Sequence, residues 1–162
     1  MSSEALTHVG MSEIAMSDGP HTVFVVPGLG SCIALVIYQP NCRLAGMAHV
    51  LLPDSSQAVS LDSPGKFADT AVPYLVEALA IRGADPAALV AKMAGGAQMF
   101  KGAPGLGVGD RNIAAITRML DALGIPLVAS DVGGALGRSI RFEIAGDRFV
   151  VRHRLGDEEV LA

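Results

Sequence analysis

Two side chains of this sequence, Cys32 and His49, could work together as a nucleophile and its base. A hairpin would bring them together, because the midpoint between them falls inside the turn-like stretch 39–42. An even-length turn centred there places Cys32 directly opposite His49. Directly opposed residues of an antiparallel pair have Cβ atoms about 5 Å apart, close enough for a thiol and an imidazole to share a proton. The spacing therefore predicts a cysteine nucleophile beside a histidine base.

The other cysteine and histidines belong to no such pattern. Cys42 falls at the turn of the expected hairpin, too far from Cys32 for a disulfide. His8, His21 and His153 are expected at the surface or at strand ends. The sequence contains no Cys-x-x-Cys, no histidine-rich tract and no dinucleotide-binding glycine motif. We expect neither a metal nor another cofactor.

Length and composition favour one globular domain. The chain has 162 residues, of which 51% are apolar and 17% charged, so it can bury a sizeable core. A net charge of −4 without a Lys/Arg cluster argues against a nucleic-acid partner. Residues 1–19 lack the features of a signal peptide, and the longest apolar stretch, 33–38, is too short to span a bilayer. These features predict a cytoplasmic protein with free thiols and no membrane insertion.

Strands come first in the expected order of elements. Residues 22–26 read as a strand that Pro27 and Gly28 stop. Residues 32–38 and 43–52 form the expected hairpin, and both are apolar at odd and even positions alike. Both faces of the sheet should therefore be covered, as in a layered sandwich.

Helices and strands alternate in the rest of the chain. Ser63 and Pro64 should start a helix that Pro73 kinks, unless this helix starts nearer Thr70. A second helix should be capped by Asp110 and end at Gly124. The remaining expected elements are strands 89–94 and 127–132, an irregular loop 97–109, a hairpin of 139–144 with 148–153, and a loose charged tail 154–162. The fold class is α/β, a single-domain sandwich of mixed, largely antiparallel sheet packed with helices.

Six runs of residues, in order along the chain, resemble the CheD family, the chemoreceptor glutamine deamidases of bacterial chemotaxis. The matching runs are 28–32, 46–53, 66–73, 92–100, 109–113 and 131–138. The resemblance implies a layered sandwich like that of deamidating bacterial toxins. It divides the chain into an N-terminal extension 1–21, a deamidase-like domain 22–153 and a C-terminal tail 154–162.

The resemblance also implies an activity, the cofactor-independent conversion of glutamines to glutamates in the cytoplasmic domain of chemoreceptors. The residues fit this chemistry, because a primary amide needs a strong nucleophile, donors for the oxyanion and an acid for the departing ammonia. Cys32 would attack, and His49 would carry the proton. The backbone N–H groups of Gly30 and Ser31 would hold the oxyanion.

One position departs from the family pattern. Family members usually carry a threonine six positions before the cysteine, as the third member of the triad, and that position is Val26 here. A valine cannot orient an imidazole by hydrogen bonding. By chemical type, the nearest alternatives are Ser31, Thr22 and Asp131. If position 26 orients His49, the substitution Val26→Thr should raise the turnover.

Two classes of function remain open. The first is the deamidase, with loops 52–64 and 97–109 as walls of a groove for the receptor. The second is a binding module that docks on receptors or on a chemotaxis phosphatase, with catalysis weak or lost because of Val26. A thiol hydrolase with another substrate is a weaker third reading. Intact Cys32 and His49 favour the deamidase.

Overall fold

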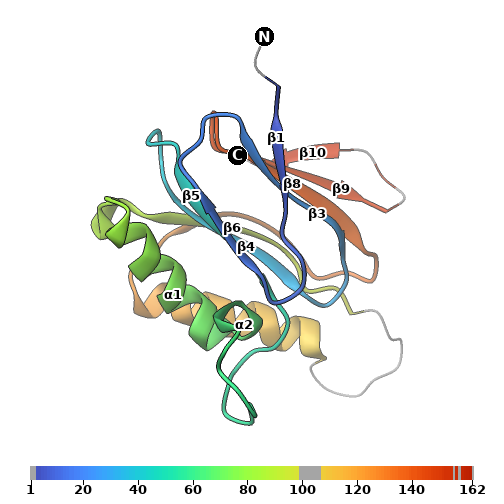
Figure 1. Ribbon diagram of the computed structural model, residues 1–162. Coiled ribbons are helices and arrows are strands. Elements are labelled where there is room, and N and C mark those ends of the chain that lie inside the picture. The colour runs from blue at the N-terminus through green and yellow to red at the C-terminus, as the bar shows by residue number, and fades with distance from the viewer. Residues whose placement is uncertain (1–2, 99–106, 155, 157, 162) are drawn as a thin grey trace.

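The computed structural model describes residues 3–98, 107–154, 156 and 158–161. These residues form two five-stranded sheets, which we call the outer and the central sheet, and two α-helices (Figure 1). The outer sheet has the strand order β1 (Ala5–His8), β3 (Thr22–Leu29), β8 (Arg138–Glu143), β9 (Arg148–His153) and β10 (Glu158–Leu161). The central sheet has the order β2 (Ile14–Ser17), β5 (Leu44–Val50), β4 (Ile33–Gln39), β6 (Val90–Gly95) and β7 (Leu127–Val132).

The central sheet is covered on both faces, as its apolar sequence predicts. On β4, Ile33 and Leu35 pack in the cluster that contains both helices, whereas Ala34 and Val36 pack in the cluster shared with the outer sheet. The pairs β1–β3 and β6–β7 are parallel, and the other pairs are antiparallel. The expected layered α/β sandwich of mixed, largely antiparallel sheet is confirmed.

The first helix begins near Thr70, the alternative start, rather than at Ser63, and the second begins just before Asp110 rather than after it. Ser63 and Pro64 start only the short 3-10 helix η1 (Pro64–Lys66), and α1 (Ala68–Ile81) follows with Pro73 inside it. A second short 3-10 helix, η2 (Pro86–Ala88), precedes β6. In α2 (Val108–Ala122), Asp110 lies within the first turn and Gly107 takes the cap position. Neither helix in the described part of the chain has the length and apolar character needed to cross a bilayer.

Both ends of the chain contribute strands. The expected N-terminal extension contains β1, which joins the outer sheet, and β2, which joins the central sheet. The expectation of a loose C-terminal tail is wrong, because β10 pairs with β9 from Glu158 to Leu161. Its glutamates are exposed on an edge strand, a position where charged side chains are common. Most of the expected loop 97–109 lies outside the described residues.

Candidate active site

The hairpin of β4 and β5 has a different register from the one expected. The ladder pairs Ala34 with His49, so Cys32 does not lie directly opposite His49. The turn spans residues 40–43, one residue further along than predicted, and both Asn41 (φ 63) and Arg43 (φ 54) have left-handed backbone conformations. Non-glycine residues seldom adopt that conformation, and the sequence pattern did not signal it.

The corrected register still leaves the thiol and the imidazole on one face of the sheet. Continued by one residue beyond the pair Ile33 and Val50, the ladder places Leu51 opposite Cys32. His49 is then the diagonal neighbour of Cys32, at a typical Cβ separation of about 7–8 Å. Both side chains lie on the face that packs against the outer sheet. Among the described residues, no hydrogen bond joins the thiol to the imidazole.

A backbone carbonyl orients the His49 ring. The imidazole is only 5% exposed, and its Nδ1 lies 3.0 Å from the carbonyl oxygen of Val9. Because a carbonyl oxygen can only accept, Nδ1 carries the hydrogen and Nε2 is left as the basic nitrogen. The His49 backbone also accepts from Ser12 N and donates to the Glu13 carbonyl, each at 3.0 Å. The segment 9–13, between β1 and β2, therefore holds this residue at three points.

Two of the three residues considered as partners for His49 bond elsewhere, and the hydroxyl of the third, Ser31, makes no hydrogen bond to His49 among the described residues. The Thr22 hydroxyl lies 2.8 Å from the Ser17 hydroxyl. Asp131 pairs with Arg138 and His153. Val26 is 1% exposed and packs in the apolar cluster between the sheets, where its side chain offers no hydrogen bond. The Val9 carbonyl thus occupies the orienting position that a third side chain fills in other triads.

Cys32 is a free, half-buried cysteine immediately before β4. Burial raises the pKa of its thiol, because a thiolate is poorly solvated there. The thiol form is therefore favoured in the unliganded protein, and attack on a substrate requires a base. Cys42 is free and exposed at the turn, as expected.

The bend between β3 and β4 leaves several N–H groups available beside the thiol. The pairing of β3 with β8 is irregular between Val26 and Leu29, and the chain then turns into β4. The carbonyls of Gly30 and Cys32 accept from Ala97 N and Gly96 N, each at 2.9 Å. In the described part of the chain, the N–H groups of residues 30–32 donate to no backbone carbonyl. Free N–H groups at a bend are suitable donors for an oxyanion.

Asn112 is a residue whose role at the site the sequence did not reveal. It lies in the first turns of α2 with no exposed surface, and its Nδ2 donates to the Ser31 carbonyl at 3.0 Å and to the Leu51 carbonyl at 2.9 Å. One side chain therefore ties the residue before Cys32 to the end of β5. The available signal was a polar side chain near the apolar stripe of an amphipathic helix.

Gly95 allows β6 to lie close against the Cys32 carbonyl. Its φ is +118°, and a Cβ atom at this position would lie 2.1 Å from the Cys32 carbonyl oxygen. Its own carbonyl accepts from Gly133 N at 2.9 Å. Gly95 is therefore a close-contact position rather than a simple turn, and it connects the nucleophile loop to the loop after β7.

His153 does not stand alone, contrary to the expectation for this residue. Its Nε2 lies 2.9 Å from Asp131 Oδ2, across the gap between the two sheets. The pairing was not visible in the sequence because it joins β7 to β9. Neither residue contacts His49 by a hydrogen bond among the described residues.

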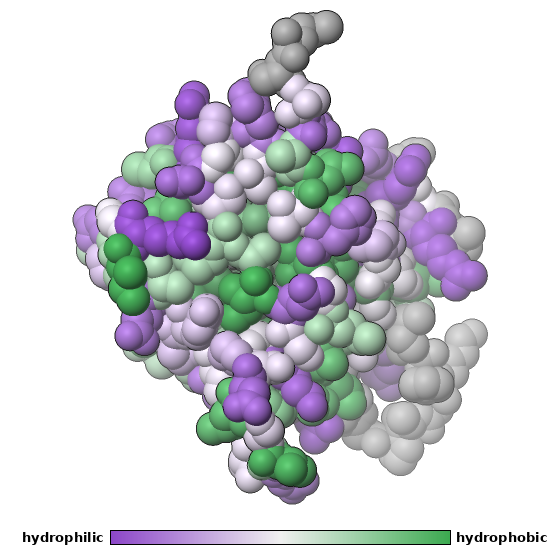
Figure 2. Space-filling view, in the orientation of Figure 1, coloured by the Kyte–Doolittle hydropathy of each residue, from purple (hydrophilic) through white to green (hydrophobic). Residues whose placement is uncertain are grey.

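A cavity of about 550 Å³ lies beside the loop between β5 and η1. The expected wall 52–64 supplies most of its lining, together with Phe67 and Arg111. This loop projects from the body of the molecule and carries apolar surface at its tip (Figures 1 and 2). Two apolar side chains of the loop, Val59 and Leu61, are exposed. Cys32 and His49 do not line the cavity.

Comparison with known proteins identifies one family. The family model described as CheD chemotactic sensory transduction matches residues 51–153, a segment that begins just after His49. Individual relatives extend the similarity over the N-terminal part of the chain, including both candidate catalytic residues.

Three relatives illustrate this similarity. A chemoreceptor glutamine deamidase CheD of Thermotoga maritima is 43% identical over 152 residues, 94% of each chain. A probable chemoreceptor glutamine deamidase CheD of Symbiobacterium thermophilum is 43% identical over 155 residues, 93% of this chain and 94% of the relative. A protein with the same description from Caldanaerobacter subterraneus is 39% identical over 150 residues, 91% of this chain and 92% of the relative.

Proposed function

Since this chain belongs to the CheD family, we propose that it is a chemoreceptor glutamine deamidase that acts in the cytoplasm through Cys32 and His49. The observation that carries the proposal is the His49 ring, whose Nδ1 is held by the Val9 carbonyl while it shares a sheet face with Cys32. A histidine with a fixed tautomer beside a thiol is the arrangement that nucleophilic amide hydrolysis requires.

In the first half of the reaction, His49 Nε2 takes the thiol proton as Cys32 Sγ attacks the side-chain carbonyl carbon of a glutamine. The carbonyl oxygen becomes an oxyanion, which the N–H groups of the bend 30–32, among them Gly30 and Ser31, stabilise. The imidazolium then gives its proton to the amide nitrogen. The C–N bond breaks, ammonia leaves, and a thioester joins Cys32 to the substrate.

In the second half of the reaction, water hydrolyses the thioester. His49 Nε2 removes a proton from water as the oxygen attacks the thioester carbonyl, and the C–S bond breaks. The imidazolium returns this proton to the departing Cys32 sulfur, and the products are a glutamate side chain and the regenerated Cys32 and His49. No cofactor is required in this scheme, because the chain itself supplies nucleophile, base and oxyanion donors.

The substrate in this proposal is the cytoplasmic domain of a chemoreceptor. A protein substrate needs a docking surface, and the loop 52–64 offers one beside its cavity. The exposed side chains of Val59 and Leu61 at its tip would contact the receptor.

The test is incubation of the protein with a chemoreceptor cytoplasmic domain, followed by peptide mass spectrometry to find glutamines converted to glutamates. Cys32→Ala should reduce conversion to the uncatalysed background, and so should His49→Gln, which keeps a donor for the Val9 carbonyl. Cys42→Ala and His21→Ala are matched controls at exposed positions and should retain full activity. Full activity of Cys32→Ala would refute the proposed mechanism.

A binding module is the second candidate function. The raised pKa of the Cys32 thiol and the apolar Val26 favour it, because both are unusual for an efficient cysteine hydrolase. Its partner would be a receptor or a chemotaxis phosphatase. If the wild-type protein converts no glutamine but binds either partner in a sedimentation or calorimetric assay, this function replaces the deamidase.

A further inference from the structure

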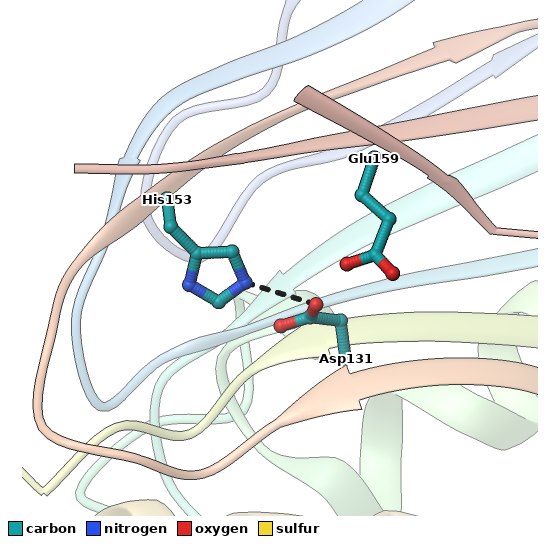
Figure 3. Close-up of side chains that lie close together, drawn as sticks. All are labelled: Asp131, His153 and Glu159. Atoms are coloured by element: carbon teal, nitrogen blue, oxygen red, sulfur yellow. Dashed lines mark hydrogen bonds and ion pairs between the residues drawn. The ribbon is translucent and has the colours of Figure 1, made fainter. Parts of the chain in front are cut away.

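Three metal-ligating side chains meet at one edge of the sandwich. They are Asp131 on β7, His153 at the end of β9 and Glu159 on β10 (Figure 3). Each offers one ligand atom, and these atoms lie within 4.8 Å of one another. We propose that this triad binds a divalent transition-metal ion of the zinc type, which joins the central sheet to the outer sheet.

The ligand types select the class of metal. One imidazole nitrogen and two carboxylate oxygens suit Zn²⁺ and neighbouring transition metals, whereas Mg²⁺ and Ca²⁺ prefer oxygen ligands alone. His153 Nε2 and Asp131 Oδ2 are 2.9 Å apart. Two ligands bonded to one tetrahedral ion at about 2.1 Å are themselves separated by about 3.4 Å, about half an ångström more than in this pair. The ion can therefore replace the hydrogen shared by this pair with little movement.

Arg138 holds Asp131 in position for such a role. The guanidinium is buried, with its side chain 2% exposed, and Nη1 lies 2.5 Å from Asp131 Oδ1 and 2.6 Å from the Asp131 carbonyl oxygen. Its Nη2 donates to the Gly133 carbonyl. One carboxylate oxygen is thus occupied by arginine while the other faces His153. Such support around a ligand fixes its orientation and strengthens metal binding.

The site is open enough to be filled. The His153 side chain is 34% exposed, and Glu159 is exposed on the edge strand β10. Figure 3 shows the Glu159 carboxylate directed toward Asp131. Water can enter and complete the coordination of an ion bound by three protein ligands.

A bound ion would cross-link the two sheets. Asp131 lies on the edge strand of the central sheet, whereas His153 and Glu159 lie on the last two strands of the outer sheet. Among the described residues, the Glu159 carboxylate has no hydrogen-bond or ion-pair partner, and the ion would neutralise its repulsion with Asp131. Binding to the folded state alone raises stability in proportion to the logarithm of metal concentration.

The experiment uses the full chain with both thiols removed, Cys32→Ala with Cys42→Ala, so that zinc cannot bind to cysteine. After treatment with EDTA and desalting, ZnCl₂ is titrated by isothermal calorimetry, and the melting temperature is measured in parallel. We expect one zinc ion per chain. We also expect the Tm to rise by about 5–10 °C at a metal concentration near one hundred times the Kd.

Two variants locate the ion. Glu159→Gln and His153→Asn, each added to the same thiol-free chain, keep side-chain size and hydrogen bonding and should each weaken zinc binding at least about tenfold. Glu158→Gln, the neighbouring residue on β10, is the matched control and should leave the Kd unchanged. Absence of zinc binding to the thiol-free chain would overturn the proposal. Equal affinity in Glu159→Gln, His153→Asn and Glu158→Gln would overturn it as well.

Discussion

At the scale of single residues, the environments of Cys32 and His49 have different effects on the two side chains. Burial raises the pKa of the Cys32 thiol, so that the nucleophile is mostly protonated at neutral pH. The Val9 carbonyl keeps the hydrogen of His49 on Nδ1, so that Nε2 is the nitrogen able to accept the thiol proton. In the proposed mechanism, the base is therefore prepared in the unliganded protein, whereas the thiolate forms only during attack.

The raised pKa predicts a rate that increases with pH. At any given pH, a raised pKa lowers the thiolate fraction, so the alkylation rate of Cys32 should keep rising beyond about pH 8.5, the usual value for a free thiol. The measurement is iodoacetamide alkylation of Cys42→Ser, in which Cys32 is the only thiol, with Cys32→Ser as the blank. A midpoint below pH 8.5 would show instead that an imidazolium stabilises the thiolate.

The Val9 contact changes the expected effect of Val26→Thr. His49 Nδ1 already has a partner, and position 26 is 1% exposed within an apolar cluster. The new hydroxyl would be buried, which should lower the free energy of unfolding by about 1–2 kcal/mol without raising kcat. Urea denaturation and the receptor assay measure the two quantities. Val25→Thr, at the partly exposed neighbouring position, is the control and should change neither the free energy of unfolding nor kcat. A higher kcat of Val26→Thr would contradict the assignment of the Val9 carbonyl as the partner of His49.

At the scale of elements, the nucleophile loop is held by contacts from α2 and β6. Asn112 of α2 bonds to the carbonyls of Ser31 and Leu51, and Gly95 of β6 lies against the Cys32 carbonyl. None of these contacts involves the thiol itself. They hold the backbone that carries it, and in the proposed mechanism this keeps the N–H groups of the bend in position for the oxyanion.

Removal of the Asn112 amide should therefore affect both stability and catalysis. Asn112→Ala leaves two buried carbonyls without their donor and should cost about 2–3 kcal/mol of unfolding free energy. In protein that circular dichroism shows to be folded, we expect glutamine conversion to fall at least about tenfold. Thr117→Ala on the same helix loses a bond to the Ile113 carbonyl. Its free energy of unfolding should stay within about 0.5 kcal/mol of the wild-type value, and its activity should be kept. Equal activities of the two variants would contradict a role for Asn112 at the site.

At the scale of the whole molecule, the N-terminal segment connects the two sheets and supports the site. β1 belongs to the outer sheet and β2 to the central sheet, and the residues between them hold His49. Val9 is 1% exposed, so its side chain is part of the core between the sheets. The base of the site is therefore positioned by a segment that precedes the expected domain.

Two truncations test this arrangement. Removal of residues 1–4 should leave stability and activity almost unchanged, because the side-chain interaction that it deletes among the described residues is an exposed ion pair of Glu4 with Arg141. Removal of residues 1–11 deletes β1 and the Val9 carbonyl. Loss of the buried valine alone should lower the free energy of unfolding by at least about 2 kcal/mol, and glutamine conversion should be abolished. Unfolding curves and the receptor assay compare the two. Full activity of the shorter chain would show that the segment is dispensable.

Local patterns in the sequence determined much of the fold. The apolar strands of the central sheet predicted cover on both faces, and the strands 127–132 and 148–153 lie where predicted. These predictions depend on neighbouring residues and on side-chain periodicity, which act over a few positions. The predicted register of the hairpin was wrong, because the observed register depends on the left-handed conformations of Asn41 and Arg43.

The candidate nucleophile and base, and their common face on a sheet, could be predicted from the sequence, because side chains alternate between the two faces along each strand of a hairpin. Their surroundings depend on contacts between distant parts of the chain. The partner of His49 is a backbone carbonyl 40 positions away, and every residue has such a group, so no residue type marks it. The contacts of Asn112 with Ser31 and of His153 with Asp131 span 81 and 22 positions. They arise from the packing of α2 on the central sheet and of one sheet on the other, which local sequence does not encode.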